Sequence, residues 1–415
     1  MLIVNALLTD ASGQKTGALR IENGKIAEVG NLAAREGEPV EDAGGAWLMP
    51  GLVDLSFHLK DPGQKRIESI ETSRIEALKG GITTLLAAPD TTPAVDNETV
   101  VEYIGAKASA TRGARVLIAG EIAKGGKLNN LSRLMGAGVA ALAGSSAMDG
   151  NLLRRSFEYA LMADRPVLIA CENEAIEGNG VMNDGNAAAR LGLPGLPDYA
   201  ESSEAVRVAE LADALQNPLL IEAVSAQRTL RALAPFKAAN AKLALSCLLP
   251  HLLLDETACE GFNTACKLFP PLRGSHDRQA LIDGVKSGLI DIVATGHLPQ
   301  EESAKDRPFE QAAAGIGCAG EFLSLVYTCL IEPGLLDAPS FIRAAAANPA
   351  KLLKEPCGAL QAGLRADLVL FDPALAREVT AREGVSKSPW HGQKLKGRVL
   401  SAWVGGEMVE GFSGD

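Results

Sequence analysis

Eight short apolar runs recur along the middle of the chain between longer amphipathic or polar segments. Runs that are hydrophobic on both faces are typical of parallel strands covered by helices. One intervening helix is expected at 68–79, where Gly80-Gly81 predicts its end. Eight strand–helix units favour a TIM-type (β/α)8 barrel over an open doubly wound sheet, and no G-x-G-x-x-G or P-loop sequence supports the open sheet. The runs are 52–55, 83–88, 115–120, 139–143, 166–171, 218–224, 242–249 and 291–295.

Both ends of the chain consist of short β segments separated by glycine-containing turns. Asn23-Gly24, between strand-like segments, predicts a tight hairpin. We expect the two ends to pair into one small composite β-sandwich made of residues 1–50 and 357–415, with the barrel occupying 51–356. The expected strands are 2–8, 18–22 and 25–29 at the start, and 366–371, 398–404 and 407–409 at the end.

Composition excludes several classes of protein. Of 415 residues, 47% are hydrophobic and 22% charged, which excludes a disordered chain, and no apolar run is long enough to span a membrane. A net charge of −11 argues against a nucleic-acid or anionic-membrane partner. Seven scattered cysteines without a C-x-x-C pair indicate reduced thiols, and the first ten residues do not form a signal peptide. We therefore expect a cytoplasmic protein.

Several ordered motifs give the chain a family resemblance over nearly its whole length. It resembles the bacterial type I dihydroorotases of the amidohydrolase superfamily. The resemblance implies an amidohydrolase-type barrel whose family members hold catalytic metal ions at the carboxyl ends of the strands. The motifs that carry it are 50–63, 80–84 with 88–91, 181–185 with 191–195, 270–273 and 292–299.

The chain departs from this family at the positions where the resemblance places substrate and metal contacts. At the first strand end the family has two metal-binding histidines, and here they are Ser56 and His58. The arginine that holds the substrate carboxylate is Lys60, which keeps the charge but lacks the bidentate fork. A substrate-binding asparagine is Asp90.

The other strand ends also depart from the family pattern. Gly144 lies where the family has an aspartate or carboxylated lysine, and the chain has no lysine at all between 127 and 237. Ala170 and Ala223 lie at histidine positions, and Gly296 lies at that of the general-base aspartate. Hydrolysis in this family needs metal-activated water and a base. We therefore expect no catalytic residue, no metal and no cofactor, and hence that the chain is not an enzyme.

Two other interpretations of the candidate site residues remain. The chain has five histidines, which we interpret as packing or hydrogen-bonding residues; the alternative is a mononuclear metal site made of His58, His297 and Glu172. Cys171 is interpreted as a small buried hydrophobic residue rather than an activated thiol. The five histidines are His58, His251, His276, His297 and His391.

The resemblance also implies a function and a partner. Type I dihydroorotases assemble with aspartate carbamoyltransferase, and we expect this chain to be a non-catalytic, structural subunit of that transferase in pyrimidine biosynthesis. One alternative is a metal-poor or mononuclear hydrolase of cyclic amides. Another is a sensor whose barrel mouth binds a pyrimidine intermediate. Self-association of the chain is left open.

Overall fold

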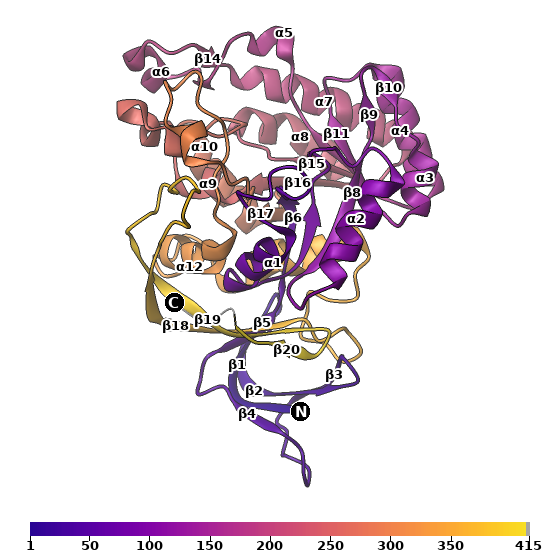
Figure 1. Cartoon of the computed structure of the whole chain (residues 1–415), viewed down its shortest axis with the longest axis vertical. Helices are drawn as coiled ribbons and strands as arrows, with labels where there is room; N and C mark the ends of the chain where they lie inside the picture. The colour runs from indigo at the N-terminus through magenta and orange to yellow at the C-terminus, as the bar shows by residue number, and fades with distance from the viewer. Residues whose placement is uncertain (412–415) are drawn as a thin grey trace.

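The computed structural model describes residues 1–411, which form a helix-covered barrel and a smaller β part (Figure 1). The barrel lies at the top of the view, and the β part lies below it. Indigo strands from the beginning of the chain and yellow strands from its end lie side by side there. The two ends of the chain therefore build one unit.

The barrel sheet has eight parallel strands in the order β17-β16-β15-β12-β11-β8-β7-β6. Each predicted apolar run contains or overlaps one of these strands, so the barrel prediction is confirmed and the open-sheet alternative is wrong. Contacts between β6 and β17 join the two ends of the sheet. The strands are β6 (Leu52–Phe57), β7 (Ile82–Ala87), β8 (Arg115–Glu121), β11 (Ala141–Ser145), β12 (Val167–Ala170), β15 (Leu219–Glu222), β16 (Leu243–Leu248) and β17 (Ile292–Ala294).

Helices follow the strands and cover the outside of the barrel (Figure 1). The first of them begins at Ile70, two residues later than predicted, because the Ser69 side chain caps it and forms a reciprocal capping box with Thr72. It ends at Lys79, before Gly80, as predicted. The long outer helices are α1 (Ile70–Lys79), α2 (Glu98–Ser109), α4 (Gly150–Met162), α7 (Asp198–Leu215), α8 (Gln227–Ala239) and α10 (Ser275–Ser287).

Shorter elements fill the connections. The short helices are α3 (Leu131–Gly136), α5 (Glu174–Glu177), α6 (Asn186–Leu191), α9 (Leu249–Leu253), α11 (Glu302–Lys305), α12 (Phe322–Val326), α13 (Ala338–Ile342) and α14 (Asn348–Leu353). Two small two-stranded sheets lie in the loops: β9 (Ala123–Lys124) with β10 (Lys127–Leu128), and β13 (Met182–Asn183) with β14 (Gly195–Leu196). No helix within residues 1–411 is long and apolar enough to cross a membrane.

A buried carboxylate joins the first and last strands of the barrel. Asp54 of β6 is fully buried and accepts hydrogen bonds from the backbone amide of Thr295 at 3.0 Å and from that of Ser56 at 3.3 Å. The Thr295 hydroxyl also donates to the Asp54 carboxylate. Beyond this contact, the His58 amide donates to the His297 carbonyl at 2.9 Å. These bonds replace a regular ladder between β6 and β17 and close the barrel.

The β part is one curled sheet of eight strands drawn from both ends of the chain. The order is β20-β19-β18-β5-β1-β2-β3, with β4 paired to β1. β18 pairs with β5 in antiparallel register, and this pairing connects the two ends. Buried Ile3, Leu19, Leu48, Leu368 and Trp403 form a core between the strands. The strands are β1 (Leu2–Asp10), β2 (Gly13–Glu22), β3 (Lys25–Gly30), β4 (Val40–Asp42), β5 (Trp47–Pro50), β18 (Leu368–Glu378), β19 (Lys394–Val404) and β20 (Glu407–Val409).

The Asn-Gly hairpin prediction is confirmed. Glu22 of β2 pairs with Lys25 of β3, so the turn has two residues. Asn23 and Gly24 have φ values of 51° and 75°, as a type I′ turn requires. The domain boundaries at 50/51 and 356/357 stay a prediction.

We expect Asp54→Ala to lower the free energy of unfolding by on the order of 3 kcal/mol. The change leaves buried donors on Thr295 and Ser56 without an acceptor, and each unsatisfied donor costs about 1–3 kcal/mol. Thermal and urea denaturation followed by circular dichroism measure the loss. Asp54→Asn keeps one acceptor oxygen and should lose less. Glu36→Ala, at an exposed loop position, is the control. An Asp54→Ala protein as stable as this control would show that the carboxylate does not hold the barrel closed.

Candidate functional site

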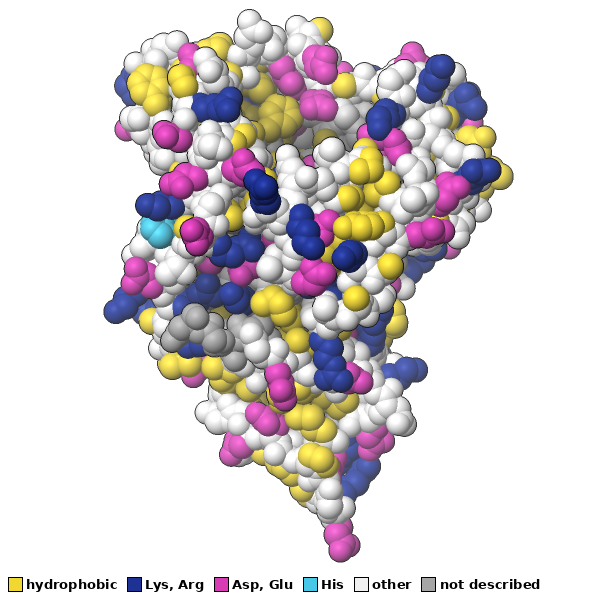
Figure 2. Space-filling view, viewed as in Figure 1, with side chains coloured by type: hydrophobic (Ala, Val, Ile, Leu, Met, Phe, Trp, Pro, Cys, Tyr) yellow, Lys and Arg dark blue, Asp and Glu magenta, His cyan; other side chains and the backbone are white. Residues whose placement is uncertain are grey.

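A cavity of about 340 Å³ opens at the carboxyl ends of the barrel strands. Figure 2 shows the molecule hollowed near the top of the view, with hydrophobic side chains inside the hollow and acidic side chains beside it. Concave, largely apolar sites with a few polar groups are typical of small-molecule binding. The polar or charged residues that line the cavity are Ser56, His58, Asp90, Ser145, Glu172 and Glu222; the apolar ones include Leu55, Leu86, Leu168, Leu248, Phe269 and Leu298.

Of the eight candidate positions from the sequence, six line this cavity. The strand ends predicted to face the mouth therefore do converge there. Lys60 and Gly296 are not among the lining residues, although both lie in segments that follow barrel strands. The six that line the cavity are Ser56, His58, Asp90, Gly144, Ala170 and Ala223.

The cavity owes its size to small side chains on neighbouring strands. Ser145 of β11 is in register with Ala170 of β12, and Ala170 is in register with Glu222 of β15. Residues in register on adjacent parallel strands point to the same side of the sheet. Ser145 and Ala170 thus leave open space beside the longer side chain of Glu222.

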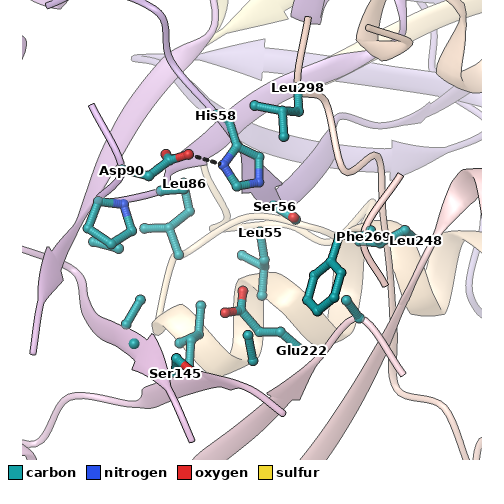
Figure 3. Close-up of a pocket in the computed structure, with 18 of the residues that line it drawn as sticks. Leu55, Ser56, His58, Leu86, Asp90, Ser145, Glu222, Leu248, Phe269 and Leu298 are labelled. Carbon is teal, nitrogen blue, oxygen red and sulfur yellow. Dashed lines mark hydrogen bonds and ion pairs between the residues drawn. The ribbon is translucent and has the colours of Figure 1, made fainter. Parts of the chain in front are cut away.

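His58 and Asp90 form a pair at one wall of the cavity (Figure 3). His58 Nδ1 lies 2.8 Å from Asp90 Oδ2. Burial alone would lower the pKa of His58, but the Asp90 carboxylate outweighs burial and the pKa is raised. The same contact lowers the pKa of Asp90 against the effect of burial. A histidine oriented by a carboxylate in this way can take up or deliver a proton.

Glu222 points into the cavity from the opposite wall (Figure 3). Burial raises its pKa to about 7; the nearby charge of His58 opposes this shift and that of Asp90 adds to it. Within residues 1–411 its carboxyl group has no hydrogen bond or ion pair. This carboxyl therefore changes its charge near neutral pH and is free to contact a ligand.

Lys60 is a buried cation close to the cavity wall. Its side chain is only 8% exposed, and burial lowers its pKa, opposed by the charges of Asp90 and Glu68. In the part of the chain that the structure describes, its ammonium group has no hydrogen bond or ion pair. Its charge acts on both His58 and Asp90, so Lys60 lies near this pair of the cavity wall.

His297 does not face the cavity. Its Nε2 lies 3.0 Å from Glu68 Oε2, and its Nδ1 accepts the backbone amides of Cys318 at 3.2 Å and Ala319 at 3.1 Å. Arg382 also forms an ion pair with Glu68. Burial alone would raise the pKa of Glu68, but His297 and Arg382 outweigh burial and hold this pKa at about 2. His297 is therefore a hydrogen-bonding residue of the frame.

The residues of the mouth do not fit the metal centre that the resemblance implies. Within residues 1–411 no group of three or more His, Cys, Asp or Glu side chains is placed to hold a metal ion. The alternative mononuclear site of His58, His297 and Glu172 is wrong, because His297 is bound to Glu68. Gly296 has a φ of +63°, and a Cβ there would lie 2.8 Å from Leu248, so an aspartate would strain the loop.

The three remaining histidines lie outside the cavity lining, and Cys171 lies in it without being an activated thiol. His251 is buried, its Nε2 lies 2.9 Å from the Pro270 carbonyl, and burial lowers its pKa to about 4. His276 and His391 are exposed. Cys171 is buried at the cavity wall, and burial raises its pKa well above the usual value, so it is not an activated thiol.

The sequence interpretation missed Glu222. Its signal was a single carboxylate that ends an otherwise apolar strand, 219–222, in a fold whose strand ends face the site. The resemblance pointed instead to the next residue, Ala223, where it implies a histidine in the family.

Comparison with known proteins gives relatives over the whole chain. A dihydro-orotase-like family model matches residues 45–227. A dihydroorotase from Acetivibrio thermocellus is 34% identical over 99% of this chain and 98% of its own, and one from Geobacter metallireducens is 35% identical over 94% of each.

Two solved structures support the fold. The L-hydantoinase (dihydropyrimidinase) from Arthrobacter aurescens superposes with a TM-score of 0.87 at 21% identity, covering 98% of this chain and 95% of that chain. The D-hydantoinase (dihydropyrimidinase) from Thermus sp. gives 0.84 at 22%, covering 98% and 94%.

The expectation that this chain is not an enzyme is contradicted by these relatives. The proteins that match nearly its full length are named dihydroorotases, which are enzymes, so the comparison supports a hydrolase family. The expectation rested on individual missing ligands. It gave no weight to the open mouth, where His58, Asp90 and Glu222 still present groups that titrate.

Glu222 should make stability depend on pH. Its pKa is about 7 in the folded protein and 4.5 when unperturbed, so the folded state binds the extra proton between these values. The neutral form of Glu222 stabilises the folded state, so the free energy of unfolding falls as pH rises from 4.5 to about 7. Between pH 4.5 and pH 8, we expect the free energy of unfolding of Glu222→Gln to rise by on the order of 1–2 kcal/mol relative to wild type. One pKa unit corresponds to ~1.4 kcal/mol, and the open mouth reduces the effect because it solvates part of the charge.

Urea denaturation across pH 4.5–8 measures this difference. Glu210→Gln, an exposed glutamate of α7, is the matched control. Parallel stability profiles for wild type and Glu222→Gln would contradict the placement of this carboxyl in a poorly solvated cavity.

Proposed function

Because this chain belongs to the dihydroorotase family, we propose that it works in pyrimidine biosynthesis, binds a cyclic amide at the barrel mouth and assembles with the catalytic chain of aspartate carbamoyltransferase. The observation that carries the binding proposal is the cavity at the strand ends, which combines apolar walls with a few convergent polar groups.

The chemistry of the cavity suits a small ring with a polar edge. Apolar walls, including Leu55, Leu86 and Phe269, can cover the faces of such a ring. Figure 3 shows His58 and Glu222 where they can meet its carbonyl and N–H groups. Lys60, whose charge acts on His58 and Asp90, can attract a carboxylate substituent. A cyclic amide with a carboxylate, as in the dihydroorotase reaction, satisfies all three requirements.

The partner is proposed from the family resemblance. Fold stability resides in the packed core, whereas chemistry resides in separable residues of the mouth. Substitutions at the mouth therefore leave the outer surface free to keep an interface. Such an interface should bury at least ~1,000 Å² in total.

We expect the transferase to reach its full size and specific activity only when it is co-expressed with this chain. Light scattering gives the mass of each assembly, and transferase activity per milligram gives the functional effect. This chain alone, sized in the same way, reports any self-association. A transferase that reaches the same mass and specific activity without this chain would overturn the assembly proposal.

A second candidate function is hydrolysis of the cyclic amide without a metal, favoured by the His58–Asp90 pair facing Glu222. His58 would take a proton from water as the water oxygen bonds to a ring carbonyl carbon. The ring C–N bond would then break, with neutral Glu222 delivering a proton to the leaving nitrogen. Positioned acid–base groups of this kind typically supply 10²–10⁴-fold in rate.

Turnover of dihydroorotate tests this candidate in buffers containing EDTA and in buffers containing zinc. We expect turnover that survives EDTA and falls about 100-fold or more in His58→Gln. His276→Gln, at an exposed histidine of α10, is the control and should keep full activity. Turnover that requires added zinc, or that is the same in His58→Gln, would refute a metal-free role for the pair.

A further inference from the structure

Glu222 is a carboxyl group without a partner inside a largely apolar cavity. Its in-register neighbour Ala170 offers no donor, and within residues 1–411 it makes no hydrogen bond or ion pair. Figure 3 shows it directed into the cavity, with the ring of Phe269 beside it. The carboxyl is half-buried, so water can reach it while the cavity is empty. A ligand that displaces this water has to supply a donor itself, because a carboxyl left without a hydrogen bond would cost about 1–3 kcal/mol.

The donor that fits is an N–H group at the edge of a flat ring. The carboxylate can only accept, and apolar side chains such as Leu86 and Leu168 surround the space next to it. A cyclic ureide, with N–H and C=O groups in its ring, presents donors at its edge and apolar faces to the walls. Phe269 can pack against one of these faces.

The charges at the mouth discriminate between ring and open chain. The lining residues include three carboxylates, Asp90, Glu172 and Glu222, but only His58 as a cationic group, and His58 is already paired with Asp90. Lys60 lies beside the cavity and can neutralise one ligand carboxylate. Hydrolysis of a cyclic ureide creates an additional carboxylate, for which no further cation is present among these residues.

We propose that Glu222 accepts a hydrogen bond from a ring N–H of a cyclic ureide, and that its charge makes the mouth select the ring-closed ligand over the ring-opened carboxylate. This inference rests on the ligand site proposed above and adds its selectivity. Glu222 then acts as a specificity-determining residue, at a position adjacent to the vacant imidazole position at Ala223.

Calorimetric titration of the full-length chain, alone and in the transferase assembly if one forms, tests the selectivity. The ligands are L-dihydroorotate, which carries one carboxylate, and its ring-opened form N-carbamoyl-L-aspartate, which carries two, at about pH 8.5, where Glu222 is ionised. We expect the ring to bind about tenfold or more tightly than the open form, a difference of ~1.4 kcal/mol, because Lys60 can pair with only one of the two carboxylates. Glu222→Gln should reduce this ratio to within about threefold while keeping most of the ring affinity. Glu222→Ala should weaken ring binding about tenfold, because it removes the acceptor.

Glu172→Gln is the matched control, since it removes another carboxylate of the same mouth. A ring preference that persists in Glu222→Gln, or that Glu172→Gln abolishes equally, would overturn the assignment to Glu222 and leave the proposed ligand site standing. Equal binding of ring and open form by the wild type would do the same. If neither dihydroorotate nor N-carbamoylaspartate binds, the proposed ligand site itself fails. Circular dichroism of each variant verifies that it folds.

Discussion

The closure of the barrel between β6 and β17 is the constraint on which the site depends. These strands are separated by more than half of the chain, and Asp54 joins them through its bonds to Thr295. The next bonds along the seam run between His58 and His297. The backbone that carries His58 is thus held by the same seam that closes the sheet. The position of the His58–Asp90 pair at the mouth follows from this closure.

The histidines near the barrel mouth differ in their role: one stabilises the fold, and another faces the cavity. His297 occupies a position in a family motif, yet its two nitrogens are both engaged by Glu68 and by backbone amides. It would be costly to remove, because Glu68 would remain buried with one partner fewer. His58, by contrast, has its Nε2 side open to the cavity. His297 therefore stabilises the fold, whereas His58 belongs to the site. Their hydrogen-bond partners distinguish the two roles.

Much of the fold could be predicted from the sequence because it depends on local pattern. The eight barrel strands follow from apolar runs of strand length, and the β2–β3 turn follows from Asn23-Gly24, whose φ values few other residue pairs adopt. The site could be predicted only in part. Six of eight candidate positions do line one cavity, because strand ends of a barrel converge. The pairing of Glu68 with Arg382, 314 residues away, has no local signal.

The unpredicted part of the site also shows why vacant ligand positions do not describe a function by themselves. The Glu222 carboxyl faces a largely apolar cavity, and burial raises its pKa to about 7. A mouth whose strand ends carry Ala170 and Ala223, where the resemblance implies histidines, thus still contains a group that titrates near neutral pH. Perturbed carboxyls in clefts are candidates for functional residues, so the groups that are present describe this site better than the ligand positions that lack a side chain.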